Sequence, residues 1–86
     1  MPVAETLQLL TRPDCELCER MHRELERLAL REALPPLTLL DVDSDPTLRR
    51  RYGLKIPVLL LGGSPVCAGR LDEQALREAL RAVERR

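Results

Sequence analysis

The chain has 86 residues, of which 44% are hydrophobic and 33% are charged, and its 14 basic and 14 acidic side chains cancel. This length and composition predict one folded domain over residues 1–86 and exclude a disordered segment. Because the net charge is zero and Tyr52 is the only aromatic residue, we expect no nucleic acid and no anionic membrane surface as a partner.

The first half of the chain predicts a β-α-β unit. Residues 6–10 are a short apolar run, which is typical of a buried strand. From Cys15 to about Ala33 no glycine or proline intervenes, and apolar side chains recur on one helical face. A pair of prolines ends this helix, and residues 37–42 predict a second strand. The two strands are then parallel, with a right-handed connection.

The second half predicts a short helix, a hairpin and a final helix. Residues 43–46 (Asp-Ser-Asp-Pro) are a helix-start pattern, and Gly53 is a natural residue to end that helix. Residues 56–61 and 65–68 predict two strands joined by a Gly-Gly turn, and Asp72 caps the last helix. The order β-α-β-α-β-β-α predicts an α/β architecture with helices on both faces of a four-stranded sheet.

The expected cellular compartment decides whether the three cysteines are read as structural disulfides or as reactive thiols. The apolar runs are far shorter than the ~20 residues that cross a bilayer, and the first residues lack the pattern of a signal peptide. We therefore expect a cytoplasmic monomer without a membrane partner. An odd number of cysteines in such a chain is a poor framework of structural disulfides, so we expect the thiols to serve chemistry.

Cys15 and Cys18 are the strongest chemical signal in the sequence. They lie three residues apart at the expected start of the first helix, close enough to exchange between dithiol and disulfide. The unpaired N–H groups and partial positive charge of a helix N-terminus favour the thiolate of Cys15. Cys15 is therefore the candidate catalytic nucleophile, and the more shielded Cys18 is the candidate resolving thiol.

Charged neighbours act on this pair in both directions. Asp14, Glu16 and Glu19 disfavour a further anion, whereas Arg12 and Arg20 oppose them. We therefore expect the helix to favour a thiolate here less strongly than in proteins that use the same pair as a strong oxidant.

Other interpretations of these residues stay open at this point. The two cysteines can be small core residues, or they can join His22 and Cys67 as four zinc ligands. The second half of such a zinc site is poorly formed, because His22 shares the helix and Cys67 is isolated, so we expect no metal. His22 is otherwise a proton relay or a solvated surface residue, and Cys67 is a core residue or a second regulatory thiol.

Several motifs together resemble glutaredoxins. Residues 11–18 (Thr-Arg-Pro-Asp-Cys-Glu-Leu-Cys) are similar to the active-site loop of that family, with a basic residue three positions before the first cysteine. Ile56-Pro57 resembles the family's Val-Pro pair, whose proline is cis, and residues 69–72 resemble the turn before its last helix. Small bacterial glutaredoxin-like proteins of the thioredoxin superfamily are also similar at residues 41–43, 51–53 and 57–59.

The resemblance implies a thioredoxin fold with a four-stranded mixed sheet, in which the dithiol loop faces the Pro57 loop. It further implies a thiol-disulfide oxidoreductase whose partners are disulfide-containing proteins or glutathione, with no bound cofactor and with glutathione as co-substrate. Arg12 and Lys55 would then contact the carboxylates of glutathione. The backbone of Ile56 would pair with its cysteinyl amide, and Asp72 with the helix start would receive its γ-glutamyl end.

A module that keeps this fold without catalysis is the alternative function. In that case the Pro57 loop would hold a peptide, a partner protein or a metal. The sequence departs from the usual glutaredoxin pattern at three places, one of which is Lys55, where the family has a threonine. Glu16 and Leu17 replace the usual Pro-Tyr between the cysteines, and Arg70 replaces the second small residue of the later turn.

Overall fold

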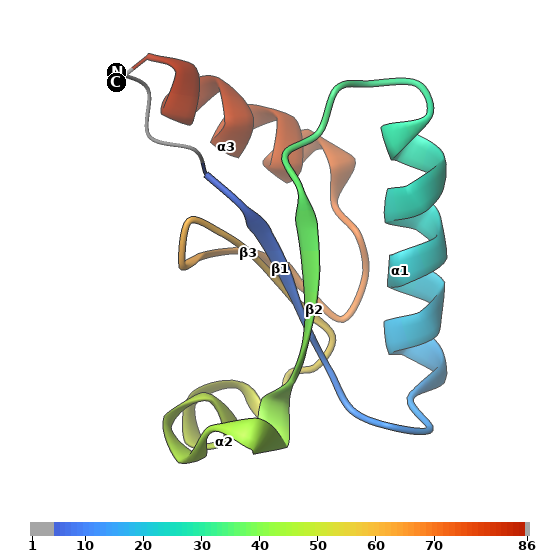
Figure 1. Cartoon of the computed structure of the whole chain (residues 1–86), viewed down its shortest axis with the longest axis vertical. Helices are drawn as coiled ribbons and strands as arrows, with labels where there is room; N and C mark the ends of the chain where they lie inside the picture. The colour runs from blue at the N-terminus through green and yellow to red at the C-terminus, as the bar shows by residue number, and fades with distance from the viewer. Residues whose placement is uncertain (1–4, 86) are drawn as a thin grey trace.

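The computed structural model describes residues 5–85 and confirms the predicted order of elements (Figure 1). A single turn of 3-10 helix, η1, precedes the second α-helix and was not expected. Along the chain the elements are β1 (Leu7–Thr11), α1 (Glu16–Ala29), β2 (Leu37–Asp41), η1 (Val42–Ser44), α2 (Pro46–Tyr52), β3 (Val58–Leu61), β4 (Ser64–Ala68) and α3 (Glu73–Glu84).

The four strands form one mixed sheet in the order β2-β1-β3-β4. β1 and β2 are parallel, as predicted from the helical connection between them, and their register pairs Leu7 with Leu37. The pairs β1–β3 and β3–β4 are antiparallel. Gly62 and Gly63 both have positive φ values, of 56° and 84°, which is the conformation that a tight hairpin turn requires. The predicted hairpin is therefore confirmed.

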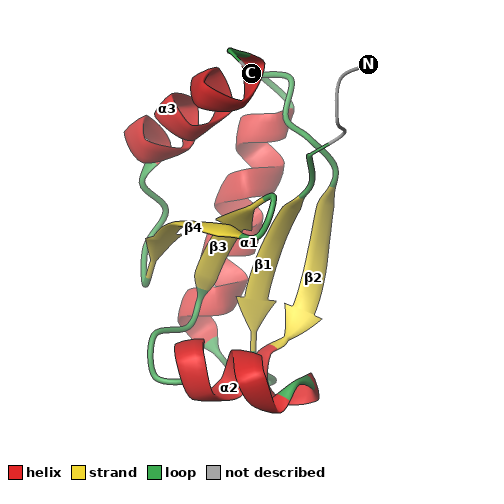
Figure 2. Ribbon diagram, turned by 90° about the vertical axis from the view of Figure 1, so that its left-hand side faces the viewer, coloured by secondary structure: helices red, strands yellow, loops and turns green. Residues whose placement is uncertain are grey.

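Helices cover both faces of the sheet, as expected (Figure 2). Alternate residues of β1 point to opposite faces: Leu9 packs with the residues of α1 and α3, whereas Leu10 packs with Tyr52 of α2. The core is aliphatic, because it is built mainly from leucines. No helix within residues 5–85 is both long enough and apolar enough to cross a membrane.

Two boundaries and the backbone conformation of one helix end differ from the prediction. α1 ends at Ala29 rather than near residue 33, since Leu28 is the last residue of its buried stripe and Leu30 is exposed. β3 begins at Val58, one residue after Pro57, which has no N–H to donate to a strand ladder. Gly53 ends α2 as predicted, but its φ is −56°, so it is not in the left-handed conformation usual for a terminal glycine.

Candidate dithiol site

Local backbone geometry places Cys15 at the N-cap of α1. Asp14 has a φ of 59°, in the left-handed region, and this residue turns the chain from the end of β1 into the helix. The Sγ of Cys15 accepts a hydrogen bond from the backbone N–H of Cys18, at 3.1 Å. The two side chains form a disulfide, with their Cα atoms 5.2 Å apart. The sequence spacing thus brings the two sulfurs together, as predicted.

The two sulfurs differ in exposure. Cys15 is half-buried, whereas Cys18 is only 2% exposed and belongs to the buried residues of α1. A substrate can therefore approach Cys15, and Cys18 is shielded behind it. This asymmetry is the one expected for a nucleophile and a resolving thiol.

Strand register brings the proline loop to the same end of the sheet as the dithiol. The Ile56-Pro57 peptide bond is cis, as the resemblance implied, and Pro57 is buried. Leu10, next to the end of β1, pairs with Val58, so Pro57 lies beside the strand end from which the dithiol loop departs. The backbone N–H of Gly69 donates to the Pro57 carbonyl at 2.8 Å, which brings the start of the next loop to the same place.

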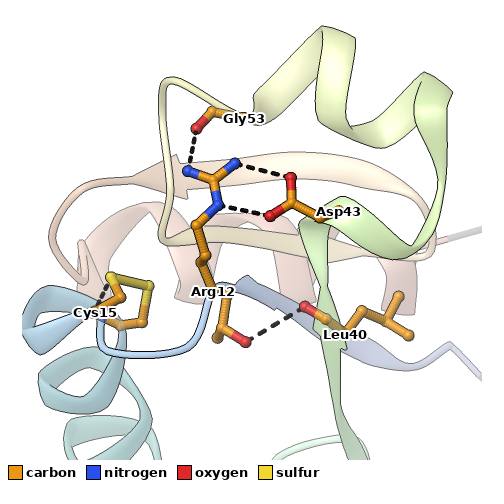
Figure 3. Close-up of a disulfide and its surroundings, with 7 residues drawn as sticks. Arg12, Cys15, Leu40, Asp43 and Gly53 are labelled. Atoms are coloured by element: carbon orange, nitrogen blue, oxygen red, sulfur yellow. Dashed lines mark hydrogen bonds and ion pairs between the residues drawn. A yellow bond between two sulfur atoms is a disulfide. The ribbon is translucent and has the colours of Figure 1, made fainter.

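Arg12 is held by protein groups rather than left pointing at the dithiol (Figure 3). Its Nε and Nη2 donate to the two carboxylate oxygens of Asp43, at 2.8 and 3.0 Å, and its Nη1 donates to the Gly53 carbonyl at 3.2 Å. The hydrogen bond from Arg12 lowers the pKa of Asp43 below its usual range, and the same bond raises the pKa of Arg12. Arg12 thus contacts Asp43 directly, and its expected effect on the acidic residues around the cysteines stays a prediction.

Asp43 and Gly53 were not among the predicted site residues, although part of the signal was present in the sequence. β1 and β2 are parallel, and Thr11 pairs with Asp41, so the residues that follow the two strands meet at one edge of the sheet. The Asp41 side chain accepts from the Asp43 backbone N–H at 2.9 Å and fixes the η1 turn that presents Asp43. The contact with the Gly53 carbonyl joins residues 41 positions apart in the chain, and local sequence does not predict it.

Of the other predicted binding residues, Lys55 and Ile56 lie in the loop before Pro57, and Asp72 lies where α3 begins. Lys55 is exposed and Ile56 is half-buried, and the Lys55 backbone N–H donates to the Tyr52 carbonyl at 2.8 Å. Asp72 is the N-cap of α3, as predicted, and its carboxylate accepts from the Ala75 backbone N–H at 3.0 Å. That carboxylate is therefore already engaged by its own helix.

A cleft of about 180 Å³ lies between the first turns of α1 and the loop before α3. Leu17, which stands between the two cysteines, forms part of its wall, and Arg70 lies on the opposite side. The cleft is thus beside the dithiol turn and is lined by both apolar and charged groups. Its lining residues are Leu17, Arg20, Met21, Glu24, Gly69, Arg70 and Leu71.

The remaining candidate residues lie apart from the dithiol. His22 is half-buried, and its Nε2 lies 3.9 Å from the Glu26 carboxylate. Cys67 is a half-buried free thiol in β4; burial raises its pKa, and a hydrogen bond from the Asp72 backbone opposes that shift. Within residues 5–85, no three His, Cys, Asp or Glu side chains are grouped so that they could hold a metal ion. The structure therefore does not assemble the four-ligand zinc alternative.

The mixed sheet, its flanking helices and the dithiol turn are those of the thioredoxin fold, which places the chain in the class of thioredoxin-fold proteins. The chain is similar to the solution NMR structure of protein Ne2328 from Nitrosomonas europaea, with a TM-score of 0.79 and 25% identity over 92% of this chain and 94% of that one. A mutant thioredoxin from Halobacterium salinarum matches with a TM-score of 0.62 and 26% identity, over 93% of this chain and 74% of that one.

Sequence comparison identifies the family within that class. The profile described as Glutaredoxin-like domain (DUF836) matches residues 6–81. Uncharacterized protein Rv0508 of Mycobacterium tuberculosis is 34% identical over 76 residues, which are 83% of this chain and 77% of that protein. A structural-genomics target protein from X. campestris is 32% identical, with a TM-score of 0.59 over 88% of this chain and 96% of that one. The chain belongs to the glutaredoxin-like family of the thioredoxin superfamily.

Proposed function

We propose that the protein is a thiol-disulfide oxidoreductase that reduces disulfides of proteins or of glutathione adducts. The observation that carries this proposal is the disulfide at the N-cap of α1, in which Cys15 is accessible and Cys18 is 2% exposed. The cis-Pro57 loop at the same end of the sheet and membership of the glutaredoxin-like family support it.

The reaction begins with both cysteines reduced. The Cys15 thiolate attacks one sulfur of the substrate disulfide; a bond forms between them, the substrate S–S bond breaks, and the second substrate sulfur leaves as a thiolate. The Cys18 thiolate then attacks the Sγ of Cys15 and releases the first substrate sulfur. The substrate has gained two electrons, its two thiolates take up the protons given up by the cysteines, and the protein holds the Cys15–Cys18 disulfide.

The site provides what each step needs from the chain. The N-terminus of α1 stabilises the Cys15 thiolate, and the backbone N–H of Cys18 already donates to that sulfur at 3.1 Å in the oxidised protein. The position of Cys18 one turn inside the helix keeps the resolving sulfur within bonding reach of Cys15 while shielding it from other disulfides. The backbone of Ile56 beside Pro57 is the proposed pairing edge for an extended substrate segment.

Turnover requires a reductant for the oxidised protein. A small thiol returns the protein to the dithiol form by the same exchange, through a mixed disulfide at Cys15 and attack by a second thiol molecule. Glutathione is the proposed co-substrate, and disulfide-containing proteins in the cytoplasm are the proposed partners. No cofactor is needed, because both electrons reside on sulfur.

Turnover of single-cysteine variants tests this function. Cys15→Ser should abolish the reduction of hydroxyethyl disulfide, and Cys18→Ser should trap a mixed disulfide that mass spectrometry detects. Cys67→Ser is the matched control, because it removes a thiol that is also shielded but lies in β4, and it should keep wild-type turnover. Equal turnover of wild type and Cys15→Ser would reject the proposal in favour of a non-catalytic module.

A further inference from the structure

Groups of the protein itself engage three of the five N–H donors of the Arg12 guanidinium. Each of its three guanidinium nitrogens donates a hydrogen bond, two to the Asp43 carboxylate and one to the Gly53 carbonyl (Figure 3). A bidentate pair of this kind uses the same fork of donors that would otherwise clasp the carboxylate of a ligand. The Asp43 carboxylate thus takes the place on Arg12 that the carboxylate of a ligand would have.

The charged side chains next to Cys15 in the sequence are acidic. Asp14 and Glu16 flank the reactive sulfur in the chain, Glu19 follows one turn later, and all three are exposed. Arg20 lines the cleft beside the dithiol, and its Nε lies 4.0 Å from the Glu24 carboxylate. An anionic substrate therefore approaches these acidic side chains while the Arg12 guanidinium is engaged by Asp43, and the exposed cations left at the site are Lys55 before Pro57 and Arg70 in the cleft wall.

We infer that Asp43 is a specificity-determining residue, which withholds Arg12 from anionic substrates and so favours neutral and cationic disulfides over glutathione disulfide. This inference rests on the proposed oxidoreductase function and narrows its substrate class. The preferred substrates are disulfides of proteins whose surroundings are neutral or basic. Glutathione disulfide, which is anionic at neutral pH, is reduced only slowly while Asp43 holds Arg12.

A series of small disulfides of different charge measures this preference. Reduced wild-type protein should react with cationic cystamine and neutral hydroxyethyl disulfide faster than with anionic glutathione disulfide. Asp43→Ala frees Arg12, and it should raise the rate with glutathione disulfide, relative to hydroxyethyl disulfide, by about three- to tenfold. The use of a ratio removes any change in intrinsic thiol reactivity, because both substrates report on the same sulfur.

Two controls separate the release of Arg12 from a simple change of charge. Glu32→Ala removes a carboxylate with the same 37% side-chain exposure and the same 2.8 Å ion pair, here to Arg77, but beyond the other end of α1. Glu16→Gln neutralises an acid next to Cys15 without freeing an arginine. Neither should change the ratio by as much as Asp43→Ala, and the double variant Arg12→Gln/Asp43→Ala should lose the gain.

Binding to the oxidised protein tests the inference without turnover. S-methylglutathione, which cannot undergo thiol exchange, should shift the Arg12 Nε–H resonance in Asp43→Ala but not in wild type. An unchanged rate ratio in Asp43→Ala, or a wild-type Arg12 resonance that titrates with S-methylglutathione, would overturn the inference. If wild type reduces no disulfide at all, the proposed function fails, and the binding experiment alone still decides what Asp43 does to Arg12.

Discussion

The regions beyond the two ends of α1 each contain an arginine–carboxylate ion pair, and the two pairs lie in very different surroundings. Arg12 donates to both carboxylate oxygens of Asp43, whereas Arg77 donates to one oxygen of Glu32 and also to Glu73. Arg12 and Asp43 meet at 2.8 Å beside the dithiol, and Arg77 and Glu32 meet at 2.8 Å at the far end, with nearly equal exposure of all four side chains. At the far end the pair joins α3 to the loop after α1. At the dithiol end the pair joins the loop before Cys15 to the segments on either side of α2. The two pairs are alike in N–O distance and in exposure but differ in location, and it is through its location beside the dithiol that we propose an effect of Arg12 on the chemistry of Cys15.

The largest expected effect distinguishes the reactive sulfur at the dithiol end from the thiol in β4. In the reduced protein at neutral pH, iodoacetamide should modify Cys15 faster than Cys67 by a factor on the order of 50. The helix N-terminus favours the Cys15 thiolate, whereas burial raises the pKa of Cys67 and keeps it protonated. Mass spectrometry of timed samples gives both rates. A faster reaction at Cys67 would remove the basis for treating the dithiol end as the reactive one.

The second prediction disturbs the hydrogen bonds among Arg12, Asp43 and Gly53 by a change to the backbone at Gly53. In Gly53→Ala the added Cβ would lie 2.5 Å from the Arg49 carbonyl oxygen and 3.4 Å from Nη2 of Arg12. Because the carbonyl belongs to the backbone, the end of α2 must move, and we expect a loss of about 1–3 kcal/mol in the free energy of unfolding. Urea unfolding measures it. A variant as stable as wild type would show that the end of α2 shifts at little cost and that a glycine at position 53 is not needed for the contact with Arg12.

A smaller effect comes from breaking each ion pair in turn. Arg12→Gln and Arg77→Gln should lower the thermal midpoint slightly and by similar amounts, because both pairs are partly exposed to solvent. Only Arg12→Gln should also change the rate of Cys15 alkylation, since only that arginine anchors the loop that carries Cys15. If Arg77→Gln altered that rate equally, the distinction between the two ends of α1 would be lost.

The smallest effect is a pH dependence. The hydrogen bond from Arg12 lowers the pKa of Asp43 in the folded protein, so the stability from this pair is complete above the usual carboxyl range. It is lost as the pH falls through the folded-state pKa of Asp43. The carboxyl carbon of Asp43, followed by NMR, should titrate at lower pH in wild type than in Arg12→Gln. Identical titration curves would contradict the ion pair.

The fold and the dithiol were predictable because their signals are local. The apolar stripe of α1, the Gly-Gly turn and the Cys15–Cys18 spacing each act over a few residues, and the structure bears out the elements they predict. The position of Arg12 was not predictable in this way. Its partners lie 31 and 41 residues away in the chain, and they meet it only because β1 and β2 are parallel and α2 ends at Gly53.

Gly53 shows a further limit of local reasoning. A glycine after a helix suggests the left-handed conformation, and here the residue has a φ of −56°. Glycine is suited to this position for a different reason, because the space a side chain would need is taken by the Arg49 carbonyl. The Arg49 carbonyl belongs to the same helix and accepts the Gly53 backbone N–H at 2.8 Å, so the need for glycine comes from the backbone geometry at the end of α2.

The central claim is that Cys15 and Cys18 cycle between a dithiol and a disulfide. Equilibration of the protein with thiol-disulfide buffers of graded potential, followed by alkylation and mass spectrometry, tests it most directly. The account predicts one reversible two-electron transition, in which Cys15 and Cys18 lose their reactivity toward the alkylating agent together while Cys67 keeps its own. Contradiction would come from a disulfide that never reduces without unfolding, or from two cysteines that oxidise independently.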